Sequence, residues 1–398
     1  MLSKIKSLGP GLLYAGAAIG VSHLVQSTRA GATYGYVLII AIILAHVFKY
    51  PFFVLGPRYA EKKQVSLIQG LAGMGNWAIW LVGILTLSTM FTIQAAVTIV
   101  TAGLIQKITN LSISPAAISC MILMVCLLIL RIGKFKVLDQ LMKVVMVVLS
   151  LTTIAAFVLS FQSVSDITAN FTSSFTLKNS TDLDFLITFV GWMPAPLDIA
   201  IWHSIWALTK SQKSQSNSDL DFKIGFYGTA FLGICFLVLG ANTLYGSDTE
   251  LVATSGGFAS QLIDMFVVNL GPGFYGVIAI AAFTTMFSTT ITCLDAMPRV
   301  MNEIWSQKSV NSRNTTSEWQ IILVGGTVSV LLFFMENMKQ MVSFATTISF
   351  LTAPILAWLC YQVVVREKDE DLWSDFEQRL ACMGIVVLGV LSLVYVFV

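Results

Sequence analysis

The chain has 398 residues, of which 56% are hydrophobic and only 11% carry a charge, against roughly 25% in soluble domains. This composition excludes a water-soluble protein, and a formal net charge of +2 gives no sign of nucleic-acid binding or of an acidic substrate. All six cysteines lie in apolar stretches without CxxC spacing, which indicates neither a disulfide framework nor a zinc site.

Apolar segments long enough to cross a bilayer recur along the whole chain. A hydrocarbon core of about 30 Å needs about 20 apolar residues per helix. We therefore predict an all-α multi-pass membrane protein, with one transmembrane domain over residues 1–398. The eleven predicted spans are Leu8 to Arg29, Tyr34 to Pro57, Asn76 to Ala102, Ile113 to Leu130, Val137 to Phe161, Phe185 to Leu208, Phe222 to Leu244, Phe274 to Trp305, Trp319 to Met335, Met341 to Val365 and Leu380 to Val398.

Lysine and arginine gather on one side of these predicted spans. The opposite side receives only Lys107, Lys178 and Lys339. Because basic loops stay in the cytoplasm, we predict a cytoplasmic N-terminus and, with eleven spans, a C-terminus outside. The membrane that we expect is the inner (plasma) membrane of a bacterium.

The first span contains a polar stretch, GAAIGVSHLVQSTR, at residues 16–29. A break inside a span frees backbone groups, which cost several kcal/mol each in lipid unless protein or a water-filled cavity receives them. We therefore predict that this helix breaks around Ile19 to His23, and that a cavity lies beside the break.

The sixth span contains a second interruption, GWMPAPLDIAIWHS, at residues 191–204. Pro194 and Pro196 cannot donate backbone hydrogen bonds, and Asp198 follows two residues later. A single kink would favour a packing role. Two breaks at the same place in each half of a 5 + 5 arrangement, each with an ionisable residue, are instead typical of transporters built from inverted repeats. The predicted repeats cover about 8–161 and 185–365, followed by an extra helix at 380–398.

Two further segments follow the sixth span. The sequence FASQLIDMFVVNL places apolar residues at helical spacing, which predicts an amphipathic helix on the outer face or capping an entrance. The eighth span is rich in hydroxyls that could coordinate Na⁺ or relay a proton, or simply pack helices together. The candidate ion-coupling residues are Asp295, Ser288, Thr289 and His203. For Asp295 the alternative is an ion pair with Arg299, and for His203 it is aromatic packing.

Five segments together resemble the Nramp family of divalent-metal transporters. They are GPGLLYAGAAIG at 9–20, AGATYGY at 30–36, GWMPAPLDIAIWHS at 191–204, AAFTTMFSTTITCLDAMPRVMNEIW at 281–305 and ISFLTAPILA at 348–357. The resemblance implies a leucine-transporter-like fold, a 5+5 inverted repeat with broken helices 1 and 6, plus an eleventh helix. It also implies that Mn²⁺ or Fe²⁺ is held by an Asp-Pro-Gly-Asn motif in the first break and a Met-Pro-His motif in the sixth.

This chain departs from both family motifs. The first motif falls on Gly20, Val21, Ser22 and His23, so its aspartate is missing. The second falls on Ala195, Pro196 and Leu197 with Asp198 next, while a shift of two residues would place Met193 and Pro194 on its first two positions. An imidazole with a carboxylate could hold Zn²⁺ or Mn²⁺, whereas oxygen ligands alone suit Mg²⁺. The predicted substrate-binding residues are Gly20, Ser22, His23, Met193, Ala195 and Asp198, with His23 and Asp198 as the metal ligands.

The function implied is secondary active transport of a divalent cation of the Mn, Fe or Mg class by alternating access. The alternative is transport of an amino acid or another small organic solute on the same fold. Without HExxH, GxSxG or a P-loop, neither an enzyme nor an ATP-driven pump is indicated. We expect no cofactor beyond the transported cation and a coupling H⁺ or Na⁺, and the predicted partners are a small cation or small solute as substrate and the lipid bilayer, with no nucleic acid. The coupling ion and the oligomeric state stay open.

Overall fold

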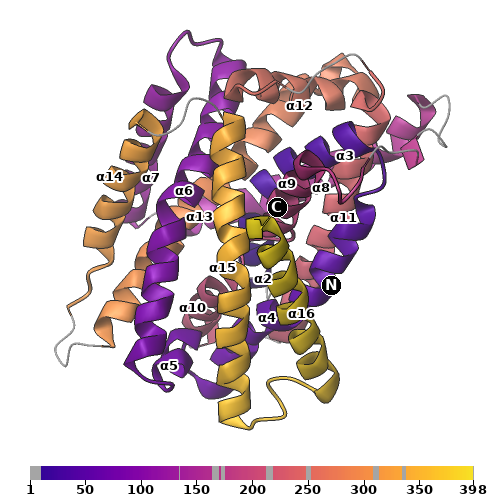
Figure 1. Ribbon diagram of the computed structural model, residues 1–398. Helices are drawn as coiled ribbons and strands as arrows, with labels where there is room; N and C mark the ends of the chain where they lie inside the picture. The colour runs from indigo at the N-terminus through magenta and orange to yellow at the C-terminus, as the bar shows by residue number, and fades with distance from the viewer. Residues whose placement is uncertain are drawn as a thin grey trace.

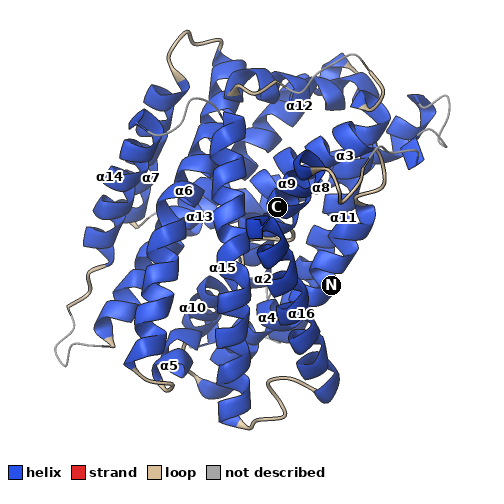
Figure 2. Ribbon diagram, in the orientation of Figure 1, coloured by secondary structure: helices blue, strands red, loops and turns tan. Residues whose placement is uncertain are grey.

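The computed structural model describes residues 10–133, 135–163, 170–171, 175–211, 218–247, 252–307, 313–333 and 338–397. Within these ranges the chain forms helices joined by loops and no strand (Figure 2). Eight helices are long and apolar enough to cross a membrane, which confirms a multi-pass membrane protein. They are α4 (Ile39–Lys63), α6 (Asn76–Thr109), α7 (Pro115–Ile132), α11 (Ser218–Leu244), α13 (Tyr275–Ser306), α14 (Thr316–Phe333), α15 (Met338–Glu367) and α16 (Asp375–Phe397).

The remaining three predicted spans are the first, fifth and sixth. The fifth is α8 (Phe135–Ser160), which a short turn, η2 (Phe161–Ser163), extends. The first is divided into α2 (Pro10–Ala18), a π-helical segment η1 (Val21–Ser27) and α3 (Thr28–Tyr34). The sixth is divided into α9 (Ser180–Trp192) and α10 (Ile199–Ser211). Both helices therefore break where their glycine, proline and polar residues predict.

Each broken helix packs its second part against a long helix from the other half of the chain. The second part of helix one, α3, packs along α11, which is the first long helix after helix six. The second part of helix six, α10, packs along α4, which is the first long helix after helix one. This exchange places both breaks at the centre of the bundle, between α6 and α13 on one side and α4 and α11 on the other (Figure 1).

The predicted amphipathic segment is a helix, α12 (Ser255–Leu270), followed by a turn, η4 (Pro272–Phe274). Its side chains at Phe258, Leu262, Met265 and Phe266 are buried, as their helical spacing predicts. The helix packs on α6, α8 and α13, and it lies across the top of the bundle in Figure 1. We call this side the α12 end.

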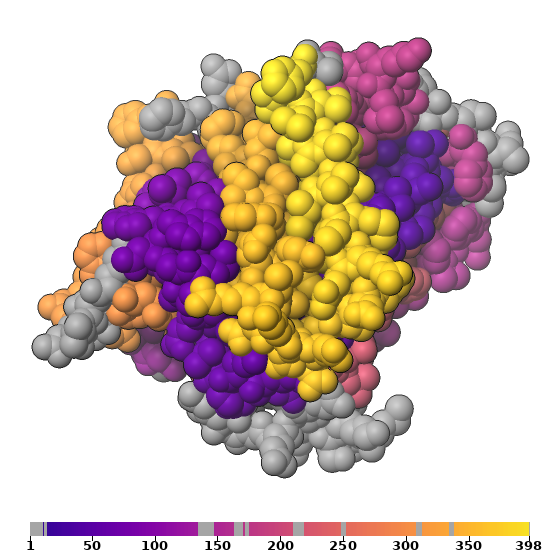
Figure 3. All heavy atoms as spheres, turned by 60° about the horizontal axis from the view of Figure 1, so that its bottom comes forward, coloured from indigo at the N-terminus to yellow at the C-terminus, as the bar shows by residue number. Residues whose placement is uncertain are grey.

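The opposite side, which we call the α5 end, is formed by the short helix α5 (Leu67–Ala72) and by the loop that joins α15 to α16 (Figure 1). Figure 3 brings this end forward and shows α15, α16 and their loop side by side in orange and yellow. Exposed leucine, isoleucine and valine side chains cover α4, α7 and α16, for example Ile40, Leu128 and Val386. Such an apolar exterior suits contact with lipid.

One close contact between α3 and α11 gives a prediction about folding. A Cβ atom placed on Gly31 would overlap the backbone carbonyl oxygen of Leu237, so the two helices must separate to admit it. We expect Gly31→Ala to reduce strongly the yield of folded, monodisperse protein, measured by size-exclusion chromatography. Gly228→Ala on α11 is the matched control, because a Cβ there meets no atom within 4 Å. Equal yields of the two variants would contradict this packing.

Candidate transport site

The break in helix one follows from a close approach to α13. A Cβ atom on Gly20 would lie 2.6 Å from Thr289 Oγ1, so only glycine fits at this position. The Thr289 hydroxyl also donates to the carbonyl oxygen of Gly16, at 3.2 Å. Helix one thus lies directly against the hydroxyl-rich face of α13, with its break at the point of contact.

The break in helix six runs from Met193 to Asp198, and Pro194 and Pro196 remove two backbone donors from it. Asp198 ends the break as the residue that precedes α10. Its carbonyl oxygen accepts from the amides of Ile201 and Trp202, at 3.0 and 3.2 Å. Its carboxylate consequently lies at the positive end of the α10 dipole, a position that stabilises a negative charge.

A small cavity of about 20 Å³ lies between the two breaks. This is room for about one water-sized sphere. Its wall is contributed by both broken helices and by α6 and α13, and most of it is apolar. The residues that line it include Ala18, Ser22, Trp192, Pro196, Trp202 and Thr289.

A larger hollow of about 530 Å³ lies toward the α12 end, between α3, α9 and α15. Arg29, Asp184 and Lys339 contribute charged groups to it. The Arg29 guanidinium lies over the ring of Phe185, 5.7 Å from its centre, so a cation–π contact joins the two broken helices at this level.

Ser22 and His23 form a local hydrogen-bonded unit at the first break. The Ser22 hydroxyl contacts the Ala18 carbonyl and lies 2.7 Å from His23 Nδ1. His23 Nε2 lies 3.0 Å from the carbonyl oxygen of Thr229 on α11. Because a carbonyl can only accept, the contact with Thr229 requires a proton on Nε2, while Nδ1 also lies 3.1 Å from the carbonyl oxygen of Ala18, beside the Ser22 hydroxyl. Ser22 therefore lines the cavity, whereas both nitrogens of His23 are engaged elsewhere.

The other predicted substrate residues divide between two places. A Cβ on Gly233 of α11 would lie 3.6 Å from Met193 Sδ and 3.5 Å from His23 Nε2, so these two side chains meet at α11. Asp198 is buried next to Thr89 of α6 and is not among the residues that line the small cavity. Ala195 is fully buried. Among the described residues, no group of three or more His, Cys, Asp and Glu side chains is arranged to hold a metal ion.

The four candidate ion-coupling residues are also separated. Ser288 and Thr289 face Gly16 of α2. His203 stacks on Tyr14, two residues earlier in α2 and so on its opposite face, with ring centres 5.6 Å apart. Within the described chain, neither ring nitrogen of His203 has a hydrogen-bond partner.

Asp295 takes the pairing alternative that its spacing to Arg299 allows. Two hydrogen bonds of 2.8 Å join its carboxylate to the guanidinium of Arg299, one turn along α13. In this arrangement the Asp295 charge is neutralised by its own helix. Its participation in ion coupling stays a prediction, as do the roles of Ser288, Thr289 and His203.

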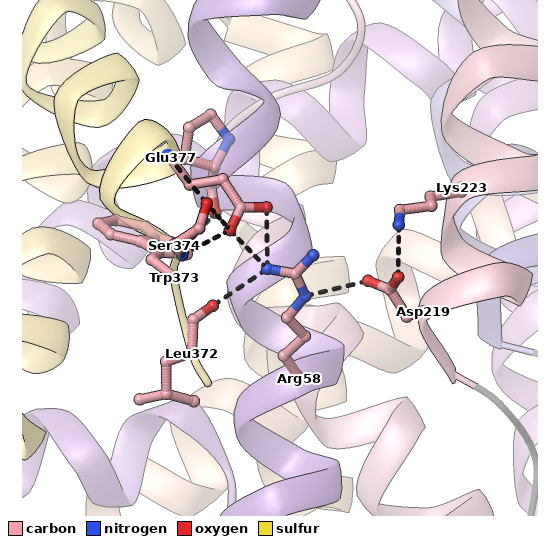
Figure 4. A network of polar contacts seen from close by, with 8 residues as sticks. Arg58, Asp219, Lys223, Leu372, Trp373, Ser374 and Glu377 are labelled. Carbon is pink, nitrogen blue, oxygen red and sulfur yellow. Dashed lines mark hydrogen bonds and ion pairs between the residues drawn. The ribbon is translucent and has the colours of Figure 1, made fainter. Parts of the chain in front are cut away.

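The α5 end is closed by a polar network that sequence reasoning did not identify (Figure 4). Arg58 of α4 donates to Asp219 at 3.0 Å, to both carboxylate oxygens of Glu377 at 2.9 Å, and to the Leu372 carbonyl at 3.2 Å. Trp373, fully buried, donates from its indole to the carbonyl of Pro51, at 2.9 Å. These contacts tie α4 to α11 and to the start of α16.

Two further residues at the site, Trp192 and Lys49, are not among the predicted site residues. The Trp192 indole donates to the hydroxyl of Ser349 on α15, at 2.9 Å, and so holds one wall of the cavity. Lys49 of α4 is fully buried against the end of α9. The signal that could have found Lys49 is a lysine in the middle of an apolar span, which defaults to a functional role.

Comparisons with known proteins agree with this geometry. A family model described as natural resistance-associated macrophage protein-like matches residues 11–397. An uncharacterised protein of Pasteurella multocida (strain Pm70) is 32% identical over 410 residues, covering 99% of this chain and 92% of the relative.

Two solved structures are similar in fold. A manganese transporter of Eremococcus coleocola superposes with a TM-score of 0.70 at 14% identity, covering 98% of this chain and 85% of that one. MhsT in complex with L-phenylalanine gives a TM-score of 0.67 at 15% identity, covering 98% of both chains. These similarities confirm the leucine-transporter-like fold expected from the two broken helices.

Proposed function

The chain belongs to the natural resistance-associated macrophage protein-like (Nramp) family, and from this premise we propose that it is a secondary active transporter of a divalent metal cation. The cation is of the Mn, Fe or Mg class, and it crosses the membrane by alternating access coupled to protons or another ion. Family membership makes the chain a transporter and not an enzyme.

The observation that carries this proposal is the size and position of the central cavity. About 20 Å³ between the two helix breaks accommodates a bare or nearly bare cation, and an amino acid is several times larger. The buried Asp198 carboxylate, which ends the break of helix six, supplies the negative charge that draws a cation to this region. The Eremococcus coleocola relative in fold is a manganese transporter, which agrees with a metal cargo.

We further propose how the predicted residues serve the cation. Ser22 and Thr289 already line the cavity and offer hydroxyl oxygens, which suit a hard and partly hydrated cation. Asp198 needs a rotation of its side chain to reach the ion. His23 becomes a ligand only after Nδ1 leaves Ser22 or Nε2 loses its proton and its bond to Thr229. Gly20, Met193 and Ala195 contribute through the backbone of the two breaks.

We also propose the membrane orientation and the two repeats that the sequence predicts. A cytoplasmic N-terminus places the α5 end inside, where Lys62, Lys63 and Arg366 gather, in agreement with the rule for basic residues. The two repeats extend over about 8–161 and 185–365, and the last helix is appended to them. A relative in Pasteurella multocida supports a bacterial inner membrane.

The second candidate function is transport of an amino acid or another small organic solute. The specific observation in its favour is the apolar lining of the cavity, which includes Trp192 and Trp202. MhsT, which shares the fold, was solved with L-phenylalanine bound. For this function the cavity would have to enlarge when the substrate enters.

Uptake by reconstituted vesicles separates the two functions. We expect purified protein in proteoliposomes to accumulate Mn²⁺ or Mg²⁺, measured with a fluorescent indicator inside the vesicles, and not to accumulate a mixture of radiolabelled amino acids. Protein-free liposomes serve as the control for leakage. Accumulation of an amino acid without uptake of either cation would overturn the metal proposal.

A further inference from the structure

Lys49 makes an unusual set of contacts at the break of helix six. Its side chain extends from α4 and is fully buried. Nζ lies 2.6 Å from the carbonyl oxygen of Val190, 3.2 Å from that of Gly191 and 3.0 Å from that of Met193. These three carbonyls belong to the last turn of α9 and to the first residue of the break.

The number of contacts defines the charge of Lys49. An ammonium group has three N–H donors and no acceptor, whereas a neutral amine would direct its lone pair at one of the carbonyl oxygens. Three carbonyl partners therefore favour the protonated form. Within the described chain, no carboxylate lies within 4.0 Å of Nζ, so the positive charge is balanced by carbonyl oxygens alone.

The position of this charge matches the helix dipole. The last carbonyls of α9 form its negative end, which attracts cations, although the Val190 carbonyl also accepts from the amide of Met193 at 3.2 Å. Asp198 occupies the converse position, a negative charge at the positive end of α10. The break of helix six therefore lies between two charges of the chain itself. The Lys49 cation is at the end of α9, and the Asp198 anion is at the start of α10.

We propose that Lys49 is a tethered cation, that is, a cation attached covalently to the chain. Its ammonium group is bound by the backbone carbonyls of Val190, Gly191 and Met193, which we call the carbonyl cradle. It takes the place of a free monovalent cation, which would otherwise be needed to stabilise the break of helix six. The ammonium keeps α9 attached to α4, while α10 packs along the same helix. As a positioning residue, Lys49 holds the wall of the cavity without contacting the transported ion. The cycle then needs no second cation at this cradle.

The surroundings of Lys49 provide a route for testing this assignment. An apolar groove of about 280 Å³, between α4, α9 and α16, is lined by Lys49 and Val190 together with Leu44, Phe48 and Leu388. Truncation of Lys49 to alanine would leave the cradle open to this groove. A short alkylammonium ion could then place its ammonium on the three carbonyls and its alkyl chain in the space left by the lysine stem.

The experiment is a chemical rescue of Lys49→Ala, measured as the melting temperature of the purified full-length protein. In choline chloride we expect the variant to melt at least about 4 °C below the wild type. Added n-propylammonium or Na⁺ at constant ionic strength should restore at least half of this loss with a saturable dependence on concentration. The wild type should not respond to either cation.

Two matched variants test the mechanism. Lys49→Met fills the space without a charge, so we expect it to be destabilised and not rescued by n-propylammonium. Lys178→Ala removes an exposed lysine and should behave as the wild type does. If Lys49→Ala does not fold in choline, it is purified in n-propylammonium, and loss of structure on removing that ion is the expected result. Rescue of Lys49→Met to the same extent, or no response of Lys49→Ala to any cation, would overturn the proposal.

This inference rests on the proposed transport function only for its role in the cycle. In proteoliposomes, metal uptake by Lys49→Ala should depend on n-propylammonium, whereas wild-type uptake should not. If the wild type transports no divalent metal while the melting temperature of Lys49→Ala still responds to cations, the proposed function fails and the tethered cation stands. If the wild type transports a divalent metal while the melting temperature of Lys49→Ala does not respond to cations, only the tethered cation is rejected.

Discussion

Asp198→Asn should abolish cation uptake while leaving the protein folded. Asparagine and aspartate are about equally good at preceding a helix, so the start of α10 should survive the change. The buried negative charge at the break of helix six, however, is removed. Two unit charges about 4 Å apart in a partly polar environment attract each other by about 4 kcal/mol. Removing this attraction should lower the affinity for the cation by at least about 100-fold. The measurement is Mn²⁺ or Mg²⁺ uptake in proteoliposomes.

The control for this variant is its melting temperature. A fold that depends on Asp198 only as a helix-capping residue would be unchanged in Asp198→Asn and destabilised in Asp198→Ala, by about 1 kcal/mol. Wild-type uptake by Asp198→Asn would mean that the carboxylate serves the start of α10 and not the cation. The site would then have to be sought among the hydroxyls of Ser22 and Thr289.

Arg58→Ala should loosen the closure at the α5 end. The side chain of Arg58 is 16% exposed, and its loss leaves Glu377, at 11% exposed, without its cation, whereas Asp219 keeps its ion pair with Lys223. Removal of one partner from a buried ion pair costs about 3–5 kcal/mol, and partial exposure reduces this to about 2–3 kcal/mol. We expect the melting temperature to fall by roughly 2–4 °C.

Two other variants calibrate this effect. Lys62→Ala removes an ion pair with Asp371 whose side chains are 37% and 75% exposed, and should shift stability by less than about 1 kcal/mol. Arg58→Lys keeps the charge but loses the paired hydrogen bonds to Glu377, so an intermediate melting temperature is expected. Equal melting temperatures of Arg58→Ala and Lys62→Ala would show that the network in Figure 4 does not hold this end closed.

The breaks of both central helices were predictable because their causes are local. Pro194 and Pro196 lack amide donors wherever the chain places them, and a polar run such as residues 16–29 disfavours an uninterrupted helix in lipid. The amphipathic spacing of α12 is equally local, and all four of its apolar residues that the pattern identifies are buried. Family membership followed from motifs spread over the same segments.

The directions of the site side chains were not predictable in this way. His23 is directed to the Thr229 carbonyl of α11, which lies 206 residues away in the chain. Lys49 reaches carbonyls 141 to 144 residues away, and Arg58 reaches Glu377 across 319 residues. Each of these contacts depends on the rotation and the height of one helix relative to another.

The sequence by itself determined the helical class, the breaks of helices one and six and the family, because composition, proline, glycine and apolar periodicity act within one or two helical turns. The tertiary structure alone decided that Asp295 pairs with Arg299, that His23 faces α11, and that Lys49 occupies the carbonyls of α9. The physical reason is that a buried polar group must find partners, and packing decides which of the available partners lies within about 3 Å.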